Sequence, residues 1–381
     1  MKPITKKQVA LTGCLLVSCL LSGCAQPSKS VARIPVIYST DLYHPPADPD
    51  DHYDLAILSC LEELEVKALI FDVATSSRQP EEFGKTAMDQ MAKITGHETP
   101  PWKVGLRDPL RSPDDRALDQ PEAFQGGVRL ILSTLEQSKE PVVLFLVGSC
   151  RDFAVAFNRN PDLLRKKVKA VYVNAGNGPQ GDQTEWNVQL DPNAYMGLMT
   201  SGLPIYWCPC FTNVYELCTP EEVSSGKAFC TYYKVDNQAD LLASARSVVK
   251  NYIAYALSRS QDEPLEFLDR APQPLPETAR NMWCTGPFLH AAGRKIRQTS
   301  DNHWIAVPSE KKVAANNHTV EVFRFEPVRF DVVRKENVEK QTPEFRDAGG
   351  TAPTSVQVFR YTHPNYNHIM TTVLQNLLET L

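Results

Sequence analysis

The apolar segment Pro141–Val147, with the sequence P-V-V-L-F-L-V, decides the fold. It contains no polar residue and is followed directly by Gly148. A strand that buries only one face alternates apolar and polar residues, whereas a strand buried on both faces, as in parallel sheets, is apolar throughout. Residues 122–139 before it and the segment that starts at Phe153 have helical character. The segment therefore predicts a central strand of a parallel sheet.

Strands and helices alternate outward from this segment in both directions. Further strands are expected at residues 35–40, 66–73, 103–106, 168–173 and 203–208, and further helices at residues 53–63, 80–95, 193–200 and 240–258. Such alternation favours a mostly parallel sheet that is flanked by helices and connected by right-handed crossovers.

The pattern changes after Pro308. Residues 320–325 and 328–333 are expected to form an antiparallel pair, 356–361 a last strand, and 369–381 a final helix. The fold class predicted is thus α/β, with a mostly parallel sheet and a small antiparallel C-terminal addition. We see no repeat and no internal linker, so residues 34–381 are expected to form one domain.

The overall composition excludes several classes of protein. Hydrophobic residues make up 42% of the 381 residues and charged residues 22%, which are globular values. The net charge is −5, whereas a protein that binds nucleic acid without regard to sequence needs a basic face. Neither a disordered chain nor a nucleic-acid partner is expected.

The N-terminal residues resemble a bacterial lipoprotein signal. Lysines at positions 2, 6 and 7 precede the apolar stretch Val9–Leu21, which is short for a membrane-spanning helix. Leu21-Ser22-Gly23-Cys24 is similar to a lipoprotein box. The resemblance implies removal of residues 1–23, acylation at Cys24 with lipid such as palmitate, and a tether over residues 24–33. A plain secretory signal is the alternative.

If the protein is exported, the sequence also bears on which membrane holds it and on whether its cysteines form disulfides. Ala25, rather than Asp, follows Cys24, which favours the outer membrane if the cell is Gram-negative. Seven cysteines follow Cys24, so they cannot all pair: Cys60, Cys150, Cys208, Cys210, Cys218, Cys230 and Cys284. Cys218–Cys230 is one candidate loop clip, because an exported chain permits disulfides. Cys208-Pro209-Cys210 looks like half a metal knuckle, but no second pair stands at zinc spacing, which favours buried or free thiols.

Acidic residues gather after the first expected strand. Asp41 ends that strand, and Asp48, Asp50, Asp51 and Asp54 follow within a few positions. Carboxylates at this density repel one another unless a hard cation such as Ca²⁺ binds among them or solvent surrounds them. A solvated loop that caps the helix starting near His52 explains the residues equally well. The composition alone does not distinguish a cation site from a solvated loop.

Polar residues also follow the middle strands. These are Gly148–Asp152, Asn174–Gly178 and Glu185–Ala194, the last with Asp191 as the expected N-cap of a helix. In a parallel sheet the carboxyl ends of the strands form the ligand edge. The chain has no G-x-S-x-G elbow, no P-loop and no G-x-G-x-x-G sequence.

Together these strand ends resemble the inosine/uridine-preferring nucleoside hydrolases. Ser39–Asp41 with Asp50-Asp51 is similar to the family's opening D-x-D-x-G-x-D-D, and Gly148–Asp152 is similar to its G-P-L-T-N. Glu185–Ala194 is similar to E-F-N-x-x-x-D-P-E-A. The resemblance extends from about Ile34 to the C-terminus and implies the Rossmann-like topology of that family.

The resemblance also implies an activity and a set of roles. In the family a Ca²⁺ ion holds the ribose hydroxyls and a water molecule, an Asp takes the proton of that water, and the N-glycosidic bond of a ribonucleoside or related glycoside is hydrolysed. The implied roles are Asp41 as metal ligand and general base, Asp51 as metal ligand, Arg151 as ligand through its carbonyl, and Asp50, Asn177, Glu185 and Asn187 as ribose ligands.

The sequence departs from the family at three places. Ser39 replaces the first Asp of the opening motif, and residues 42–49 hold an insertion. The family's His-Asp pair near the start of a late helix is best matched by His290-Ala291, so Ala replaces a calcium ligand. Fewer carboxylates weaken or abolish Ca²⁺ binding, while His290 could still protonate the leaving base.

Two functions stay open from the sequence. One is a lipid-anchored hydrolase of ribonucleosides or related glycosides, and the other is a non-catalytic lipoprotein that binds nucleosides or sugars. Trp186, Phe211, Tyr215 and Trp283 are candidates for stacking on a base, although ordinary packing also explains them. Self-association is compatible with either function.

Overall fold

The computed structural model describes residues 1, 33–73, 84–179, 181, 185–212, 215–311, 317–334, 343–347 and 354–381. The chain divides into two compact units, Met1–Ala32 and Arg33–Leu381. Cys24 and most of the expected tether lie outside the described residues. Within the described part of the chain, no helix is both long and apolar enough to cross a membrane. The second unit is described below.

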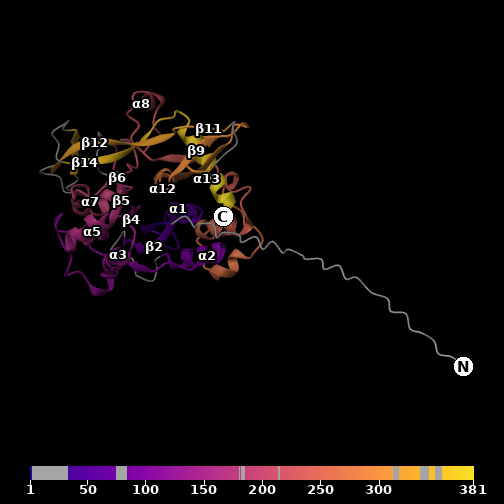
Figure 1. The fold of residues 1–381 in the computed structure, drawn as a ribbon, viewed down its shortest axis with the longest axis horizontal. Coiled ribbons are helices and arrows are strands. Elements are labelled where there is room, and N and C mark those ends of the chain that lie inside the picture. Colours follow the sequence, from indigo (N-terminus) through magenta and orange to yellow (C-terminus); the bar gives the residue numbers. More distant parts are fainter. Residues whose placement is uncertain are drawn as a thin grey trace. The chain divides into compact units, whose positions relative to one another are not determined.

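A nine-stranded sheet forms the centre of the second unit, with the strand order β13-β12-β14-β6-β5-β4-β1-β2-β3 (Figure 1). The pairs from β3 to β6 are parallel, β14 pairs with β6 in parallel, and β12 is antiparallel to both β13 and β14. Its strands are β1 (Ile34–Thr40), β2 (Leu64–Phe71), β3 (Trp102–Val104), β4 (Val142–Leu146), β5 (Val168–Val173), β6 (Ile205–Trp207), β12 (Phe323–Arg334), β13 (Pro343–Asp347) and β14 (Thr354–Tyr361).

The expected fold class is therefore confirmed, including the antiparallel C-terminal addition. Two small antiparallel sheets accompany the main one: β7 (Tyr233–Val235) with β8 (Arg280–Met282), and β9 (Arg294–Gln298) with β10 (Trp304–Pro308) and β11 (His318–Thr319). The helices are α1 (Asp50–Ser59), α2 (Lys85–Thr95), η2 (Glu122–Phe124), α3 (Gly126–Gln137), α4 (Arg151–Arg159), α5 (Pro161–Lys167), α6 (Trp186–Leu190), α7 (Pro192–Met199), α8 (Pro220–Ser224), α9 (Gln238–Leu241), α10 (Ser247–Leu257), α11 (Pro264–Leu268), α12 (Thr285–Ala291) and α13 (Tyr366–Thr380).

Helices cover both faces of the sheet because its central strands are apolar on both faces. Every residue of β4 is buried. Along β1 the side chains alternate: Val36 and Tyr38 join one hydrophobic core, and Ile37 joins the other. Helices α3, α4, α5 and α7 contribute to the core that contains Ile37, and α1, α10, α12 and α13 contribute to the core that contains Tyr38 (Figure 1).

Two expected elements differ from the structure. The two strands expected at residues 320–325 and 328–333 are one strand, β12, which continues through Pro327 and pairs with β14 from Phe323 to Phe330. Proline lacks only the N–H group, so a strand can continue through it where that donor is not needed. The helix expected at residues 240–258 is split into α9 and α10, because Arg246 has an extended backbone with ψ 149°.

The carboxyl ends of the parallel strands share one edge of the sheet. Asp41 leaves β1 there, Val147 leaves β4, and Asn174 leaves β5. Asp191 begins α7 as expected, since its side chain accepts a hydrogen bond from the Ala194 N–H at 2.9 Å. This edge carries polar groups that the motifs predicted.

Candidate active site

A cavity of about 520 Å³ lies at the carboxyl edge of β1, β4 and β5. Its volume is in the range that holds a small organic ligand. It is lined by Asp41, Tyr43, Ala47, Asp48, Asp50, Asp51, Asp54, Val147, Asn174, Asn177, Glu185, Trp186, Asn187, Cys210, Phe211, Tyr215, Trp283 and Cys284. The structure thus brings together six of the predicted site residues, from two distant parts of the chain.

One end of the cavity is acidic. Asp41 follows β1, and Asp50, Asp51 and Asp54 come from the first turns of α1; we call these four residues the acidic end. The Thr40 hydroxyl donates a hydrogen bond to Asp51, and the carboxyl groups of Asp51 and Asp41 are hydrogen-bonded to each other. The start of α1 is favourable for such residues, because a helix N-terminus stabilises negative charge.

Burial and mutual repulsion shift the titration of these carboxyls. Burial, followed by the neighbouring charge of Asp48, raises the pKa of Asp50 well above its ordinary value. Burial, followed by the charge of Asp41, raises the pKa of Asp51 in the same way. Burial raises the pKa of Asp54 to about 7, and its Oδ1 atom is buried without a hydrogen-bond partner among the described residues.

The lining also holds the predicted ribose ligands Glu185 and Asn187. Glu185 caps α6 and accepts hydrogen bonds from the Asn187 N–H at 3.0 Å and the Gly176 N–H at 2.8 Å. The Asn187 amide donates to the carbonyl of Asn174 at 2.9 Å and to that of Val147 at 3.2 Å. These bonds tie α6 to the ends of β4 and β5, so Glu185 and Asn187 are held in fixed positions.

Two thiols lie between these two ends, and the sequence motifs did not predict them. Cys284 is hydrogen-bonded to Asp54, and its Sγ lies 3.6 Å from Asn174 Oδ1. The Asn174 amide in turn donates to Cys210 Sγ at 3.1 Å, and Cys210 is hydrogen-bonded to Glu185. A chain of thiol, amide and thiol therefore connects the acidic end to Glu185. The position of Cys210 just after a strand was the only signal for it in the sequence.

The structure does not bring His290 and Ala291 to the cavity. They end α12, whereas the residues just before α12, Trp283 and Cys284, line the cavity. The His290 Nδ1 lies 2.7 Å from the Tyr172 hydroxyl, and burial lowers the His290 pKa to about 4. Cys284, rather than Ala291, therefore stands at the helix start, where the resemblance implied an acidic ligand. The sequence comparison aligned His290 with the family's histidine, because the sequence alone did not show where the helix begins.

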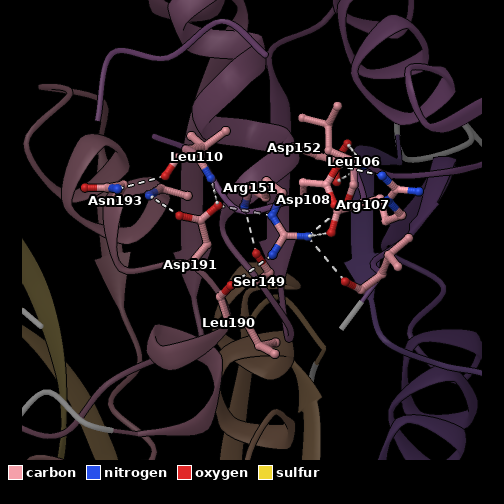
Figure 2. A network of polar contacts seen from close by, with 12 residues as sticks. Leu106, Arg107, Asp108, Leu110, Ser149, Arg151, Asp152, Leu190, Asp191 and Asn193 are labelled. Atoms are coloured by element: carbon pink, nitrogen blue, oxygen red, sulfur yellow. Dashed lines mark hydrogen bonds and ion pairs between the residues drawn. The ribbon is translucent and has the colours of Figure 1, made fainter. Parts of the chain in front are cut away.

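Arg151 is not among the residues that line the cavity, and its expected role as a ligand through its carbonyl stays a prediction. Its guanidinium is buried and forms an ion pair with Asp191, with Nε 3.1 Å from Oδ2 (Figure 2). It also donates to the carbonyls of Val73, Leu106, Arg107 and Leu190. Close to the end of β4, Val147 forms the wall instead. Arg151 thus joins three loops behind the site.

Aromatic rings form one side of the cavity. Phe211, Tyr215 and Trp283 line it, and Tyr232 packs against them; we call these four residues the aromatic wall. The ring centroids of Phe211 and Tyr215 are 4.5 Å apart, and those of Tyr232 and Trp283 are 5.6 Å apart. Trp186 also lines the cavity and is 59% exposed, so it lies at the entrance.

The arrangement of donors does not fit a complete calcium site. Within the described residues, no group of three or more His, Cys, Asp or Glu side chains is placed so that it could hold a metal ion. Ca²⁺ takes about 6–8 oxygen ligands. Asp41 and Asp51 are instead bonded to each other, and Cys284 offers sulfur, which is a poor ligand for a hard cation.

Comparisons with known proteins agree with the motifs. Residues 50–272 match the family described as inosine-uridine preferring nucleoside hydrolase. The chain is 27% identical over 192 residues to the pyrimidine-specific ribonucleoside hydrolase RihA of Citrobacter koseri, and 29% identical over 192 residues to RihA of Salmonella schwarzengrund. Each match covers 45% of this chain and 58% of the relative, so the chain spans little more than half the length of these curated relatives.

Solved structures of the family share the fold. The inosine-uridine preferring nucleoside hydrolase of Bacillus anthracis aligns over 91% of this chain and 100% of its own, with a TM-score of 0.50 and 13% identity. The plant nucleoside hydrolase PpNRh1 aligns over 91% and 99%, with a TM-score of 0.51 and 15% identity. At such identity these structures support the fold alone. With the match over residues 50–272, the ordered motifs and the shared fold, the chain belongs to the inosine-uridine preferring nucleoside hydrolase family.

Proposed function

We propose that the protein hydrolyses the N-glycosidic bond of ribonucleosides or closely related ribosides. The observation that carries the proposal is the cavity, in which Asp41 and Asp51 face the same space as Glu185 and Asn187. The two pairs come from parts of the chain far apart in sequence, one at β1 and the start of α1 and the other after β5. Carboxylates on both sides of a sugar-sized space are the groups that such a hydrolysis needs.

The chemistry assigns a separate task to each side of the cavity. Cleavage of the bond between C1′ and the base nitrogen builds positive charge on the sugar, and the acidic end stabilises that charge. Asp41 accepts the proton of the attacking water. Asp51 is hydrogen-bonded to Asp41 and accepts a hydrogen bond from the Thr40 hydroxyl. These bonds hold the general base, Asp41, in place. Asp50, Asn177, Glu185 and Asn187 bind the ribose hydroxyls.

Calcium remains a hypothesis that rests on the family resemblance. The proposed ligands are Asp41, Asp51 and the backbone at Arg151, and a bound Ca²⁺ would polarise the water and the ribose hydroxyls. Because the donors, as they are placed, do not fit a complete site, the steps above use only groups of the protein. His290 as proton donor is not retained, since it does not line the cavity.

The test is turnover of a nitrophenyl riboside by the purified chain and by Asp41→Asn. The substitution keeps the size of the side chain but removes the base, so kcat should fall about 100-fold or more while KM changes little. Asp262→Asn, which changes an exposed aspartate paired with Arg270, is the matched control and should keep full activity. Equal kcat values for the chain and Asp41→Asn would remove Asp41 from the mechanism.

A second function is favoured by one observation, the thiol of Cys284 at the start of α12. If this replacement has removed the catalytic metal, the protein is a nucleoside- or sugar-binding lipoprotein. Calorimetry with ribonucleosides distinguishes the two functions: binding of intact nucleoside without release of ribose supports the binding protein, and release of ribose supports the hydrolase.

The N-terminal sequence, which resembles a lipoprotein signal, supports a proposal about location. We propose that it is exported, acylated at Cys24 and anchored to a membrane, with the outer membrane favoured in a Gram-negative cell. Metabolic labelling with a fatty acid tests this, because Cys24→Ser should abolish the labelling. Self-association is a further proposal, which light scattering of the purified protein tests.

A further inference from the structure

We propose that the preferred ligand of the cavity is a riboside whose aglycone carries a fixed positive charge, of the N-ribosylpyridinium class. The inference rests on the proposed function for its reaction, but its recognition part stands on the cavity alone. Three features of the cavity lead to it: the sign of its charges, the aromatic wall, and the groups that it offers to a leaving base.

The ionisable side chains of the lining have one sign. Six carboxyl groups line the cavity, and no Lys, Arg or His stands among the described residues that line it. They are Asp41, Asp48, Asp50, Asp51, Asp54 and Glu185. Burial raises the pKa of Asp50, Asp51 and Asp54, so some of the six groups hold a proton, but no cationic side chain of the lining offsets those that are ionised. A concave, weakly solvated site focuses such a field and attracts cations, while it repels phosphate-bearing nucleotides.

A described cation outside the lining, Arg280, is already engaged. Arg280 donates from Nη1 to Asp48 and from Nε to Gln238 Oε1, the latter at 3.4 Å. Its side chain is only 18% exposed. The ion pair neutralises Asp48 in part. The charge of Arg280 also acts on Asp50, where it is outweighed by burial and by the neighbouring acids.

The aromatic wall stands next to these acids. Tyr215 lies close enough to Asp48 and Asp50 that, after burial, their charges are the main causes of its raised pKa. The Tyr215 and Trp283 ring centroids are 6.4 Å apart, and Phe211 packs on Tyr215. A flat cation between such rings and neighbouring carboxylates gains both cation–π and ionic attraction, whereas a neutral base gains stacking only.

A charged aglycone also removes the need for a proton donor. When water attacks C1′ of an N-ribosylpyridinium, the electron pair of the C1′–N bond moves to the ring nitrogen, and a neutral pyridine leaves. The proton of the water goes to Asp41, so the products are ribose, pyridine and one proton. A neutral base must instead be protonated as it leaves, and His290, the expected donor, hydrogen-bonds Tyr172 outside the cavity lining.

The test separates recognition from reactivity, because pyridinium ribosides are intrinsically more labile than uridine. A methylated pyridinium carboxamide and an uncharged methylbenzamide of the same shape are titrated into the full chain by calorimetry. The cation should bind about tenfold more tightly. Asp48→Asn should reduce that ratio, and Tyr215→Leu should reduce it further by removing an aromatic face. Asp262→Asn is the control and should leave the ratio unchanged.

Turnover then tests the reaction itself. The chain should hydrolyse an N-ribosylpyridinium with a higher kcat/KM than uridine, and Asp48→Asn should lower this ratio by acting on the charged substrate. Equal binding of the two probes, or tighter binding of the benzamide, overturns the inference even if uridine is hydrolysed. Selective binding of the cation without hydrolysis of any riboside would support the recognition proposed here and contradict the hydrolase.

Discussion

At the scale of single residues, the side chain of Arg151 has a structural task that the motif did not predict. The match to the family's second motif concerned its carbonyl alone. In the structure its guanidinium spans Asp191 and four carbonyl groups behind the cavity (Figure 2). A planar group with five N–H donors suits such a junction of loops. Arg151 therefore holds the surrounding loops in position.

Arg151→Met should destabilise the protein strongly. The variant leaves Asp191 buried without its ion-pair partner, which costs about 3–5 kcal/mol. Urea unfolding of the purified chain measures the loss. Arg165→Met, which breaks an exposed pair with Asp162, is the control and should cost about 1 kcal/mol or less. A loss of similar size for both variants would contradict the role given to Arg151.

Cys284 leads to a second prediction at this scale. Cys284→Asp places a carboxylate beside Asp54 at the acidic end, so the variant should be less stable than the parent chain without metal and should gain more stability from added Ca²⁺. Thermal unfolding with calcium and with a chelator measures the difference. Ala291→Asp is the matched control at the far end of α12. If Ala291→Asp responds to calcium and Cys284→Asp does not, the assignment of the helix start is wrong.

At the scale of elements, Cys218 and Cys230 follow two residues of the aromatic wall, Phe211 and Tyr215, along the chain. The Sγ atoms of Cys218 and Cys230 are 2.9 Å apart, and Thr212 Oγ1 lies 3.1 Å from Cys218 Sγ. Cys230 is buried and hydrogen-bonded to Tyr361 of β14. The candidate clip of the sequence thus has its two thiols side by side, although both are free in the structure.

In a thiol–disulfide buffer of the exported compartment's potential, Cys218 and Cys230 should form a disulfide. Both thiols lose their hydrogen and the buffer disulfide is reduced. Closing this loop should stabilise the protein by about 2–4 kcal/mol. Peptide mapping without reduction identifies the cross-link, and thermal unfolding before and after reduction measures its effect. Cys218→Ser should abolish both the cross-link and its effect on thermal unfolding. If all cysteines of the parent chain still react as free thiols after oxidation, the bond does not form.

The elements that the sequence predicted well are those with a strong local signal. The apolar run of β4 and the Asp191 cap of α7 both depend on neighbours in the chain. The single strand β12 did not follow from the sequence, since only pairing with β14 carries it through Pro327. The start of α12 was also missed, because Cys284 has no side-chain cap bond to mark it.

The same distinction holds for the candidate site. Asp41, Asp50 and Asp51 could be predicted because they stand directly after a strand in a motif-like order. Cys210 and Cys284 could not, since their contacts with Asn174 join residues far apart in the chain. Tertiary contacts of this kind leave no periodic pattern in the sequence.

At the scale of the whole molecule, buried ionisable groups couple stability to pH. Burial, followed by the charge of Asp72, raises the pKa of Asp152 to about 7, and the Leu106 N–H donates to its Oδ1 at 3.1 Å. The folded protein therefore holds a proton on Asp152 over a range in which the unfolded chain has lost it. Burial lowers the pKa of His52 to about 3, which acts in the opposite direction.

The contribution of Asp152 can be isolated by comparison with Asp152→Asn. An unfolded Asp titrates near pH 4, so between about pH 4 and pH 7 the stability of the parent chain should fall relative to the variant by about 1.4 kcal/mol per pH unit. Denaturant unfolding at several pH values measures this difference, from which His52 cancels. A difference that does not change with pH would show that Asp152 is ionised in the folded protein.

The two ends of β1 lie at opposite edges of the sheet. Its first residues follow Arg33, whose guanidinium bonds to the carbonyls of Glu62 at 2.9 Å and Leu64 at 2.8 Å, and its last residue leads to Asp41 in the cavity. Pulling on the N-terminal segment would therefore load the amino edge, where Arg33 is fastened. The chain therefore enters this unit at the amino end of β1, and the cavity for solutes lies at the carboxyl end of the same strand.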